Sequence, residues 1–293
     1  MNGEIAMITA PATGAPRASG GALRMTPGRW VALAVGVPIA FVLIGWSAFS
    51  LVAAIGRASF PVNTSVPLQD GHLVASTGGG DITVRQDQTR GGTARLTGTV
   101  QYSLIRPRLT IGGDGLHLDC RLPTGNCGLN ATLDVPLDTS VNLSSAGGNM
   151  QVSGIQRDVT LNSAGGDVTI SGLGATANVS TGGGNVSASD LGSTVQFSTD
   201  GGDVDGNGLF APYVTTYSGG GNVTLVFTRV PANLKIISDG GDINIVLPQG
   251  STGYAINYVT DGGDYSASGV PVSKSGHPID VESGGGNISI AES

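Results

Sequence analysis

Charged residues are scarce in this chain of 293 residues, because Lys, Arg, Asp and Glu together make up only 12% of it. The Lys and Arg residues are also scattered, whereas a nucleic-acid-binding surface groups them on one face. Nucleic acid is therefore not an expected partner. Four of the 14 basic residues and one of the 21 acidic residues precede residue 58, which leaves 10 basic and 20 acidic residues beyond it.

Histidine is almost as rare, with three copies at His72, His117 and His277. None of them lies in a nucleophile elbow or in a metal-binding spacing. The many aspartates could supply the acid–base pair of a glycan-active β-helix enzyme, but no local signature selects such a pair. We therefore expect a non-enzymatic protein without catalytic residues or cofactor, and we keep the glycan-active enzyme as an alternative.

Glycine is abundant, with 49 residues, which is about twice its ordinary usage. The G-X-Y period of collagen is missing, and regularly placed Val, Ile and Leu residues argue against disorder. Many short strands joined by tight turns fit this composition. The expected fold class is all-β.

A long uncharged stretch runs from Trp30 to Ile55, between Arg29 and Arg57. As a helix these residues would measure about 39 Å, which is enough to span a bilayer, and they far exceed the apolar region of a cleaved signal peptide. Three arginines precede the stretch and one follows it, so residues 1–29 are expected to be a disordered cytoplasmic tail. The rest of the chain is then extracytoplasmic, beginning with a linker at 56–69.

The two cysteines, Cys120 and Cys127, flank a Pro-Thr-Gly-Asn turn. In an oxidising compartment this arrangement favours a local disulfide. Metal binding is the alternative, but two ligands without clustered histidines make a poor site.

The tripeptide Gly-Gly-Asp or Gly-Gly-Asn recurs, and from residue 149 onward it does so every 18 to 23 residues. Apolar residues lie eight and six positions before the Asp/Asn and one and three positions after it. Both patterns have the two-residue period of a strand with one buried face. The last residues of the tripeptide are Asp81, Asn149, Asp167, Asn185, Asp203, Asn222, Asp242, Asp264 and Asn287.

One repeat is too short to bury its own apolar face, but stacked repeats bury theirs together. The sequence therefore predicts a parallel β-solenoid over residues 141–293, with rungs of about 18–23 residues. A β-sandwich or barrel of antiparallel hairpins is the alternative. The copy around Asp81 is an outlying one, and residues 70–140 are expected to be an N-terminal β cap or insertion that carries the cysteines.

Stacking would align the equivalent residues of the repeats in columns. We expect the turn glycines to supply positive φ and the Asp/Asn column to be a structural turn ladder, in which alternating Asn separates the Asp charges. A hydroxyl residue always precedes the Asp/Asn by four positions and could bond the turn backbone. These residues are Thr77, Ser145, Ser163, Thr181, Thr199, Ser218, Ser238, Thr260 and Ser283.

The motif Asp-Gly-Gly-Asp occurs three times and could hold Ca²⁺ through carboxylate oxygens. Its spacing differs from the nonapeptide of calcium-binding β-rolls, so turn chemistry is the favoured interpretation. The calcium candidates are Asp200, Asp203, Asp239, Asp242, Asp261 and Asp264.

The stretch from Leu133 to Gly154, followed by strand–GGD–strand copies, resembles the bacterial DUF4097 family of adhesin-like proteins. The resemblance covers roughly residues 70–290. It implies a β-solenoid-like domain of the bacterial envelope and offers no catalytic residues to carry over.

Together these observations predict a single-pass protein of the cell membrane whose extracytoplasmic domain is an adhesin-like or envelope-interaction module. The expected partners are the membrane, through residues 30–55, and a cell-wall polymer or an envelope protein. The alternative from another class is an accessory ectodomain of an envelope-stress signalling system.

Overall fold

The structure is a computed structural model that describes residues 39, 57–88, 90–113, 115–120, 127–250 and 253–293. Residues 53–293 form one compact unit. No helix among the described residues is long and apolar enough to cross a bilayer. The expected tail at 1–29 and span at 30–55 lie outside the described residues, apart from Ile39.

The described residues form 23 strands in two sheets. The twelve-strand sheet contains, in spatial order, β1 (Arg57–Pro67), β4 (Thr93–Ser103), β7 (Cys127–Val135), β3 (Ile82–Gln86), β9 (Met150–Ser153), β11 (Val168–Ser171), β13 (Val186–Ser189), β15 (Val204–Leu209), β17 (Val223–Phe227), β19 (Ile243–Leu247), β23 (Ile288–Glu292) and β21 (Tyr265–Ser268). The eleven-strand sheet contains β20 (Tyr254–Thr260), β22 (His277–Ser283), β18 (Asn233–Ser238), β16 (Tyr213–Ser218), β14 (Thr194–Thr199), β12 (Ala177–Thr181), β10 (Val159–Ser163), β8 (Ser140–Ser145), β2 (His72–Thr77), β6 (Gly115–Asp119) and β5 (Arg108–Gly112).

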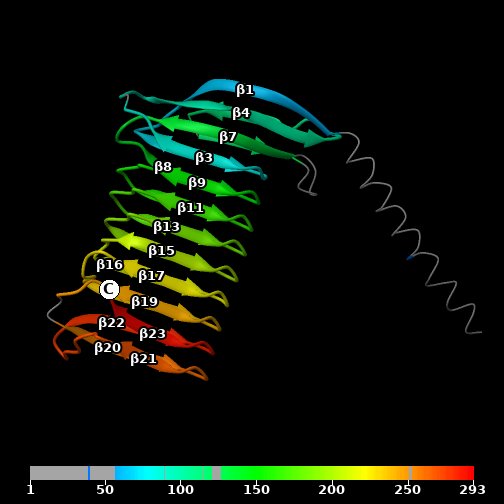
Figure 1. The fold of residues 1–293 in the computed structure, drawn as a ribbon. Coiled ribbons are helices and arrows are strands. Elements are labelled where there is room, and N and C mark those ends of the chain that lie inside the picture. The colour runs from blue at the N-terminus through cyan, green and yellow to red at the C-terminus, as the bar shows by residue number, and fades with distance from the viewer. Residues whose placement is uncertain (1–38, 40–56, 89, 114, 121–126, 251–252) are drawn as a thin grey trace, which may run out of the picture. The chain divides into compact units, whose positions relative to one another are not determined.

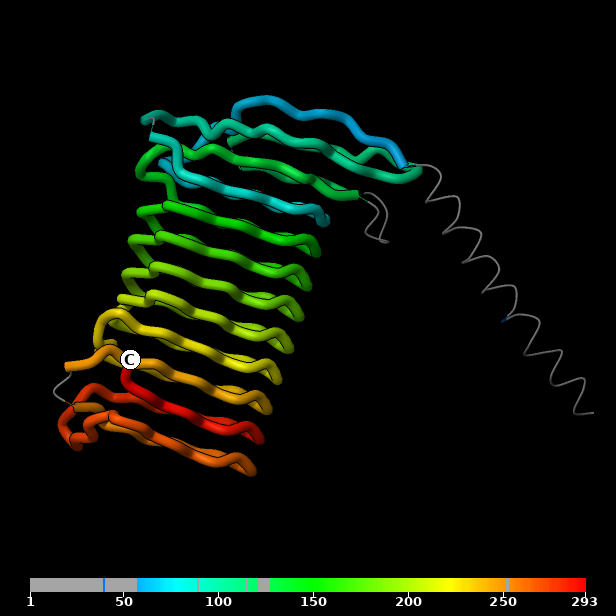
Figure 2. The backbone as a smooth tube through the Cα atoms, in the orientation of Figure 1, coloured from blue at the N-terminus to red at the C-terminus, as the bar shows by residue number. Residues whose placement is uncertain are grey.

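Each repeat is one rung, made of a strand in the eleven-strand sheet, a glycine turn and a strand in the twelve-strand sheet. Neighbouring rungs pair in parallel with equivalent residues opposite one another, as Val141, Val159 and Ala177 are. Figures 1 and 2 show the rungs stacked. The expected all-β architecture of stacked parallel rungs is confirmed, and the hairpin alternative is wrong for the repeats.

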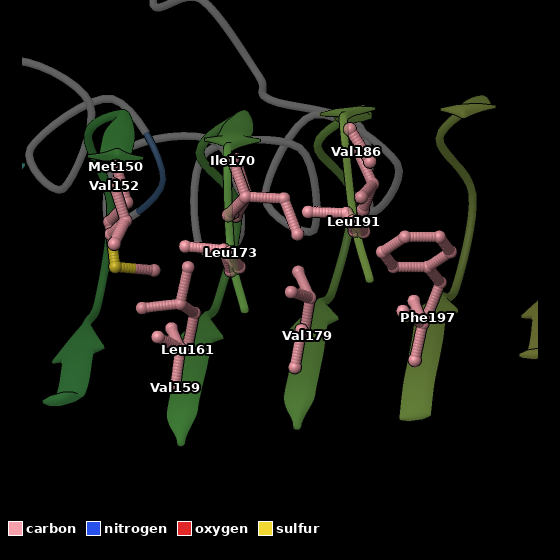
Figure 3. Close-up of a cluster of buried hydrophobic side chains, with 14 of the residues drawn as sticks. Met150, Val152, Val159, Leu161, Ile170, Leu173, Val179, Val186, Leu191 and Phe197 are labelled. Atoms are coloured by element: carbon pink, nitrogen blue, oxygen red, sulfur yellow. The ribbon is translucent and has the colours of Figure 1, made fainter. Parts of the chain in front are cut away.

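The core lies between the two sheets and consists of the apolar residues of each two-residue pattern. Leu161, Ile170 and Phe197 are completely buried, and Figure 3 shows such side chains from both sheets pointing toward one another. Leu173 and Leu191 close the side of the core at the second turn of their rungs. Burying each of these large side chains stabilises the fold by about 1.5–3 kcal/mol.

The N-terminal part of this unit differs from its sequence-based assignment in two respects. The described residues 57–69 of the expected linker are not a linker, because β1 pairs antiparallel with β4 along its whole length and Val66 is fully buried. Residues 72–86 are not part of a cap but form a regular rung, since β2 and β3 pair in register with β8 and β9. The predicted disulfide joins Cys120 to Cys127.

The last two rungs do not stack in sequence order. Strands β22 and β23 pair with β18 and β19, while the preceding copy, β20 and β21, lies outside them. Figure 2 shows the red C-terminal segment lying inside the terminal orange rung. Along the chain, the terminal rung (β20 and β21) therefore comes before the rung that lies beside β18 and β19 (β22 and β23).

The turn glycines have a different role from the expected one. Of the glycines that directly precede the Asp/Asn, only Gly80 and Gly148 have positive φ. At the others the stacked backbone excludes a side chain, since a Cβ on Gly221 would lie 2.0 Å from the carbonyl oxygen of Gly202 in the neighbouring rung. The expectation of positive φ is wrong for these turns, because close packing of rungs imposes the glycine.

Candidate functional site

The Asp/Asn residues form one continuous column of hydrogen bonds along the stack. The backbone N–H of each residue donates to the side-chain Oδ1 of the residue before it in space, at 2.7–3.0 Å. The structure brings all nine predicted residues into this column. Their spatial order is Asp81, Asn149, Asp167, Asn185, Asp203, Asn222, Asp242, Asn287 and Asp264.

A tenth member, Asn130 on β7, was missed by sequence reasoning. Its Oδ1 accepts the backbone N–H of Asp81 at 2.9 Å. Part of the repeat pattern is present here, because Ala131 and Leu133 follow Asn130 at the apolar positions of a repeat and are buried. The tripeptide itself is incomplete, because Gly128-Leu129 stands where the other copies have two glycines.

In space, Asn and Asp alternate without exception over these ten positions. Two Asp side chains in adjacent rungs would lie about 4.8 Å apart and repel each other by about 1 kcal/mol even in water. An intervening Asn doubles that distance and keeps an acceptor oxygen for the next backbone N–H. Its amide can also donate to a carboxylate, as Asn287 Nδ2 does to Asp242 Oδ1 at 3.2 Å.

The Ser/Thr column forms a second set of hydrogen bonds, and all of its residues except Thr260 are buried. The Thr199 hydroxyl donates to the carbonyl of Gly184 in the neighbouring rung at 3.1 Å and accepts the N–H of Gly202 in its own turn at 2.9 Å. Thr181, Ser218, Ser238 and Ser283 make the same pair of bonds. Each hydroxyl thus satisfies polar backbone groups that the turn leaves inside the stack.

The calcium candidates are distributed over alternate rungs. The rung of Asn222 separates Asp203 from Asp242, and the rung of Asn287 separates Asp242 from Asp264. Alternate rungs are about 10 Å apart, which is too far to share one Ca²⁺ with oxygen distances near 2.4 Å. Among the described residues, no three His, Cys, Asp or Glu side chains converge on a metal position.

The remaining candidates for chemistry are dispersed over the unit. His72 Nδ1 bonds the Ser140 hydroxyl, and His277 packs against the Tyr254 ring. A hollow of about 500 Å³ lies beside Tyr102, Gly128 and Asn130, and Arg57 is its only charged lining residue in the described part of the chain. None of these places holds a pair of carboxylates, so the structure groups no acid–base pair at them.

The outer face of the twelve-strand sheet has the most regular chemistry on the surface. Register pairing aligns small polar side chains along it with one carboxylate, Asp205. The aligned residues are Thr132, Thr83, Gln151, Thr169, Ser187, Asp205, Thr224, Asn244, Ser289 and Ser266. A second column beside it contains Ser153, Ser171, Ser189 and Asn207. We call these two columns the polar face.

The outer face of the eleven-strand sheet is less uniform. Its equivalent column consists of amides and hydroxyls, with charged residues on β18 and β22. The aligned residues are Asn142, Thr160, Asn178, Gln196, Thr215, Lys235, Asp280 and Asn257. Two exposed tyrosines, Tyr213 and Tyr217, stand on the same face.

The fold and these columns define a two-sheet domain of stacked parallel β-rungs, in which the Asp/Asn column and the Ser/Thr column join the turns of neighbouring rungs. The chain belongs to the family described as Toastrack DUF4097, whose family model matches residues 69–291. The comparison with curated proteins found no match.

Two solved structures are similar to this chain at low sequence identity. A proposed adhesin from Bacteroides fragilis is 15% identical with a TM-score of 0.44, covering 80% of this chain and 97% of its own. A proposed cell adhesion protein from Clostridium sporogenes is 13% identical with a TM-score of 0.30, covering 80% of this chain and 100% of its own.

Proposed function

We propose that this protein is a non-enzymatic, membrane-anchored module outside the cytoplasm that binds an extended envelope partner, in the manner of an adhesin. The observation that carries the proposal is the polar face. Its hydroxyl and amide groups repeat at the rung spacing of about 4.8 Å along the sheet. A cell-wall polymer or an extended protein segment offers hydrogen-bonding groups at regular intervals and could engage many rungs at once.

The rigidity of the stack supports this role. Each hydrogen bond to a ligand contributes only about 0.5–1.5 kcal/mol net, so useful affinity requires many bonds with little ordering cost. The Asp/Asn column ties turn to turn along the stack, and the hydroxyls of the Ser/Thr column add bonds between neighbouring rungs from Thr181 to Ser283, so the rungs are held in register. Small side chains such as Ser187 and Thr169 also lose little rotamer freedom on binding.

Binding is tested with residues 57–293, which contain the core of the compact unit, after oxidative expression to form the disulfide. The purified domain is incubated with cell-wall sacculi and, separately, with membrane extract, and the bound fraction is measured. We expect the sacculi or the membrane extract to retain the domain, and no sugar fragments to be released. Retention by neither would overturn the proposal, and release of sugars from the wall would indicate the enzyme instead.

The face is tested with paired substitutions. Thr169→Arg with Ser187→Arg places bulky charges on the polar face and is expected to lower retention at least about tenfold. Thr160→Arg with Asn178→Arg makes the same change at adjacent rungs of the eleven-strand sheet and should leave retention unchanged. Equal loss in both variants, or in neither, would count against the polar face as the binding surface.

The membrane anchor belongs to the same proposal and rests on the uncharged stretch at 30–55. The full chain is expected in the carbonate-resistant membrane fraction, with residues 57–293 cleaved by protease added outside intact spheroplasts. Recovery in the soluble fraction would contradict the anchor.

A further inference from the structure

The terminal rung, β20 and β21, ends both sheets at one end of the stack. Figure 1 places both strands beyond β22 and β23. The free edge of β20 is the longer of the two, with seven residues.

Backbone hydrogen bonds show which groups point to this free edge. Tyr254 N donates to Pro271 O at 2.8 Å, and Ser273 N donates to Tyr254 O at 2.9 Å, on the side away from β22. Because strand residues alternate in direction, the N–H and C=O of Ile256, Tyr258 and Thr260 face the same side. The loop that carries Pro271 and Ser273 covers only the start of the strand.

Beyond the start that the loop covers, the edge lacks the usual protection against pairing. Tyr254–Thr260 contains neither a charged residue nor a proline, and a long uncharged edge invites another strand. The other edge of the eleven-strand sheet is different, because β5 carries Arg108. A charged residue on an edge strand discourages pairing with another strand.

The same rung exposes side chains that are buried in every inner rung. Tyr258 is opposite Val281, yet it is 48% exposed whereas Val281 is 3% exposed. Its ring stacks on Tyr265 with centroids 3.7 Å apart, so the two tyrosines only partly cover the end of the core. Val259 adds a large apolar side chain on the outer face of the edge.

We propose that two copies of this protein pair through their β20 edges, about a two-fold axis at Tyr258. Antiparallel pairing there places Ile256 opposite Thr260 of the partner subunit and Tyr258 opposite itself. All three residues point their backbone groups to the edge, so the pairing would form about six hydrogen bonds. The eleven-strand sheet would then continue from one copy into the other.

The occupant is a second copy because the edge is complementary to itself. Asp261 and Asp264 follow β20, while Lys274 lies in the loop beside its start. A two-fold axis brings the acidic end of one strand to the basic end of the other. A two-fold contact uses the same β20 edge of both copies, so it closes as a dimer and does not propagate as a fibre.

The dimer is tested by sedimentation equilibrium of residues 57–293 and by membrane cross-linking of the full chain. Val259→Lys adds charge at the edge and is expected to weaken dimerisation at least about tenfold. Tyr213→Lys is the matched control, because Tyr213 and Val259 are both 54% exposed on the outer face of the eleven-strand sheet, but Tyr213 is on an inner strand.

A cysteine substitution tests the register itself. Both native cysteines are in the disulfide, and residues facing each other in a hydrogen-bonded antiparallel pair have Cα atoms about 5.5 Å apart, within disulfide range. Tyr258→Cys should therefore form a disulfide-linked dimer under mild oxidation, whereas Tyr213→Cys should not.

Several outcomes would overturn the proposal. The first is a wild-type domain that stays monomeric at 100-fold the concentration of the binding assay, together with no Tyr258→Cys cross-link in membranes. The second is a dimer that Val259→Lys does not weaken. The third is a different protein bound at the β20 edge. Loss of the dimer without loss of wall or membrane retention would leave the proposed binding function intact.

Discussion

The backbone N–H of Asn287 donates to the carboxylate Oδ1 of Asp242 at 2.7 Å, although 45 residues separate them. Asp264, which lies between them in sequence, instead donates its N–H to Asn287 Oδ1 at 2.9 Å. The exchange of the last two rungs therefore completes the alternation of Asn and Asp. In sequence order, Asp242 and Asp264 would have been adjacent carboxylates.

This alternation predicts that Asn185→Asp destabilises the domain. The substitution keeps the acceptor Oδ1 but creates three successive carboxylates with Asp167 and Asp203. The repulsion is about 1 kcal/mol with each neighbour in water, and salt screens it. Thermal unfolding at low and high salt should show a lower Tm that recovers partly in 1 M NaCl.

Asp203→Asn is the matched control for that substitution. It also keeps Oδ1 but removes charge from the column, so its Tm should change less and depend less on salt. A larger loss for Asp203→Asn than for Asn185→Asp would show that charge alternation is not what stabilises the column.

The glycine next to the Asp/Asn is predicted to be intolerant of any side chain. Gly221→Ala would place Cβ 2.0 Å from the Gly202 carbonyl oxygen, whereas Gly220→Ala meets nothing within 4 Å. Overpacking of this kind costs about 1–3 kcal/mol and occasionally more. Chemical denaturation should give a large loss of unfolding free energy for Gly221→Ala and a small change for Gly220→Ala; similar values would refute the close-packing account.

The buried hydroxyl column is predicted to stabilise the turns. Thr199→Val keeps the shape of the side chain but leaves the carbonyl of Gly184 and the N–H of Gly202 without this partner. Unsatisfied buried groups cost about 1–3 kcal/mol. Thr215→Val, on the exposed face of the adjacent strand, is the control and should leave the free energy of unfolding nearly unchanged.

Tyr217 is predicted to titrate above the ordinary range of tyrosine. Its hydroxyl donates to Asp239 Oδ2 at 2.8 Å, and this hydrogen bond, followed by the charge of Asp239, raises the pKa of Tyr217. The raised pKa means that the contact stabilises the fold below the unfolded pKa of about 10 and is lost as the pH rises through the folded value.

A ¹³C-tyrosine NMR titration measures this pKa. Asp239→Asn should lower it toward the ordinary value, whereas Asp200→Asn should have a smaller effect because Asp200 acts only through its charge. An unchanged pKa in Asp239→Asn would contradict the assigned cause.

Calcium is predicted to leave the stability of the domain unchanged. The Oδ1 atoms of Asp203 and Asp242 already accept backbone N–H groups, and the candidate carboxylates lie in alternate rungs. Melting in 5 mM CaCl₂ and in EDTA should give the same Tm, and calorimetry should show no binding heat. A rise in Tm with calcium that Asp242→Asn abolishes would establish a site.

The sequence predicted the repeats well because their signals are local. The apolar pattern around Asn185, for example, is contained within one rung and reads directly as two half-buried strands. Asn130 was not predicted, because its copy lacks the paired glycines. Strand β1 was not predicted, because its prolines and polar residues are typical of a linker. The position of Asn130 in the column and the pairing of β1 both depend on strands that are distant in sequence.

By itself, the sequence determined the all-β repeat, the buried faces of its strands, the disulfide, the Ser/Thr column and all of the Asp/Asn column except Asn130. These features follow from residue type and a period of two, which are properties of neighbouring residues. Only the tertiary structure decided the order of the last two rungs, the reason for the turn glycines and the exposed edge of β20. Those depend on which backbones come within a few ångströms of one another, and that is settled when the rungs stack.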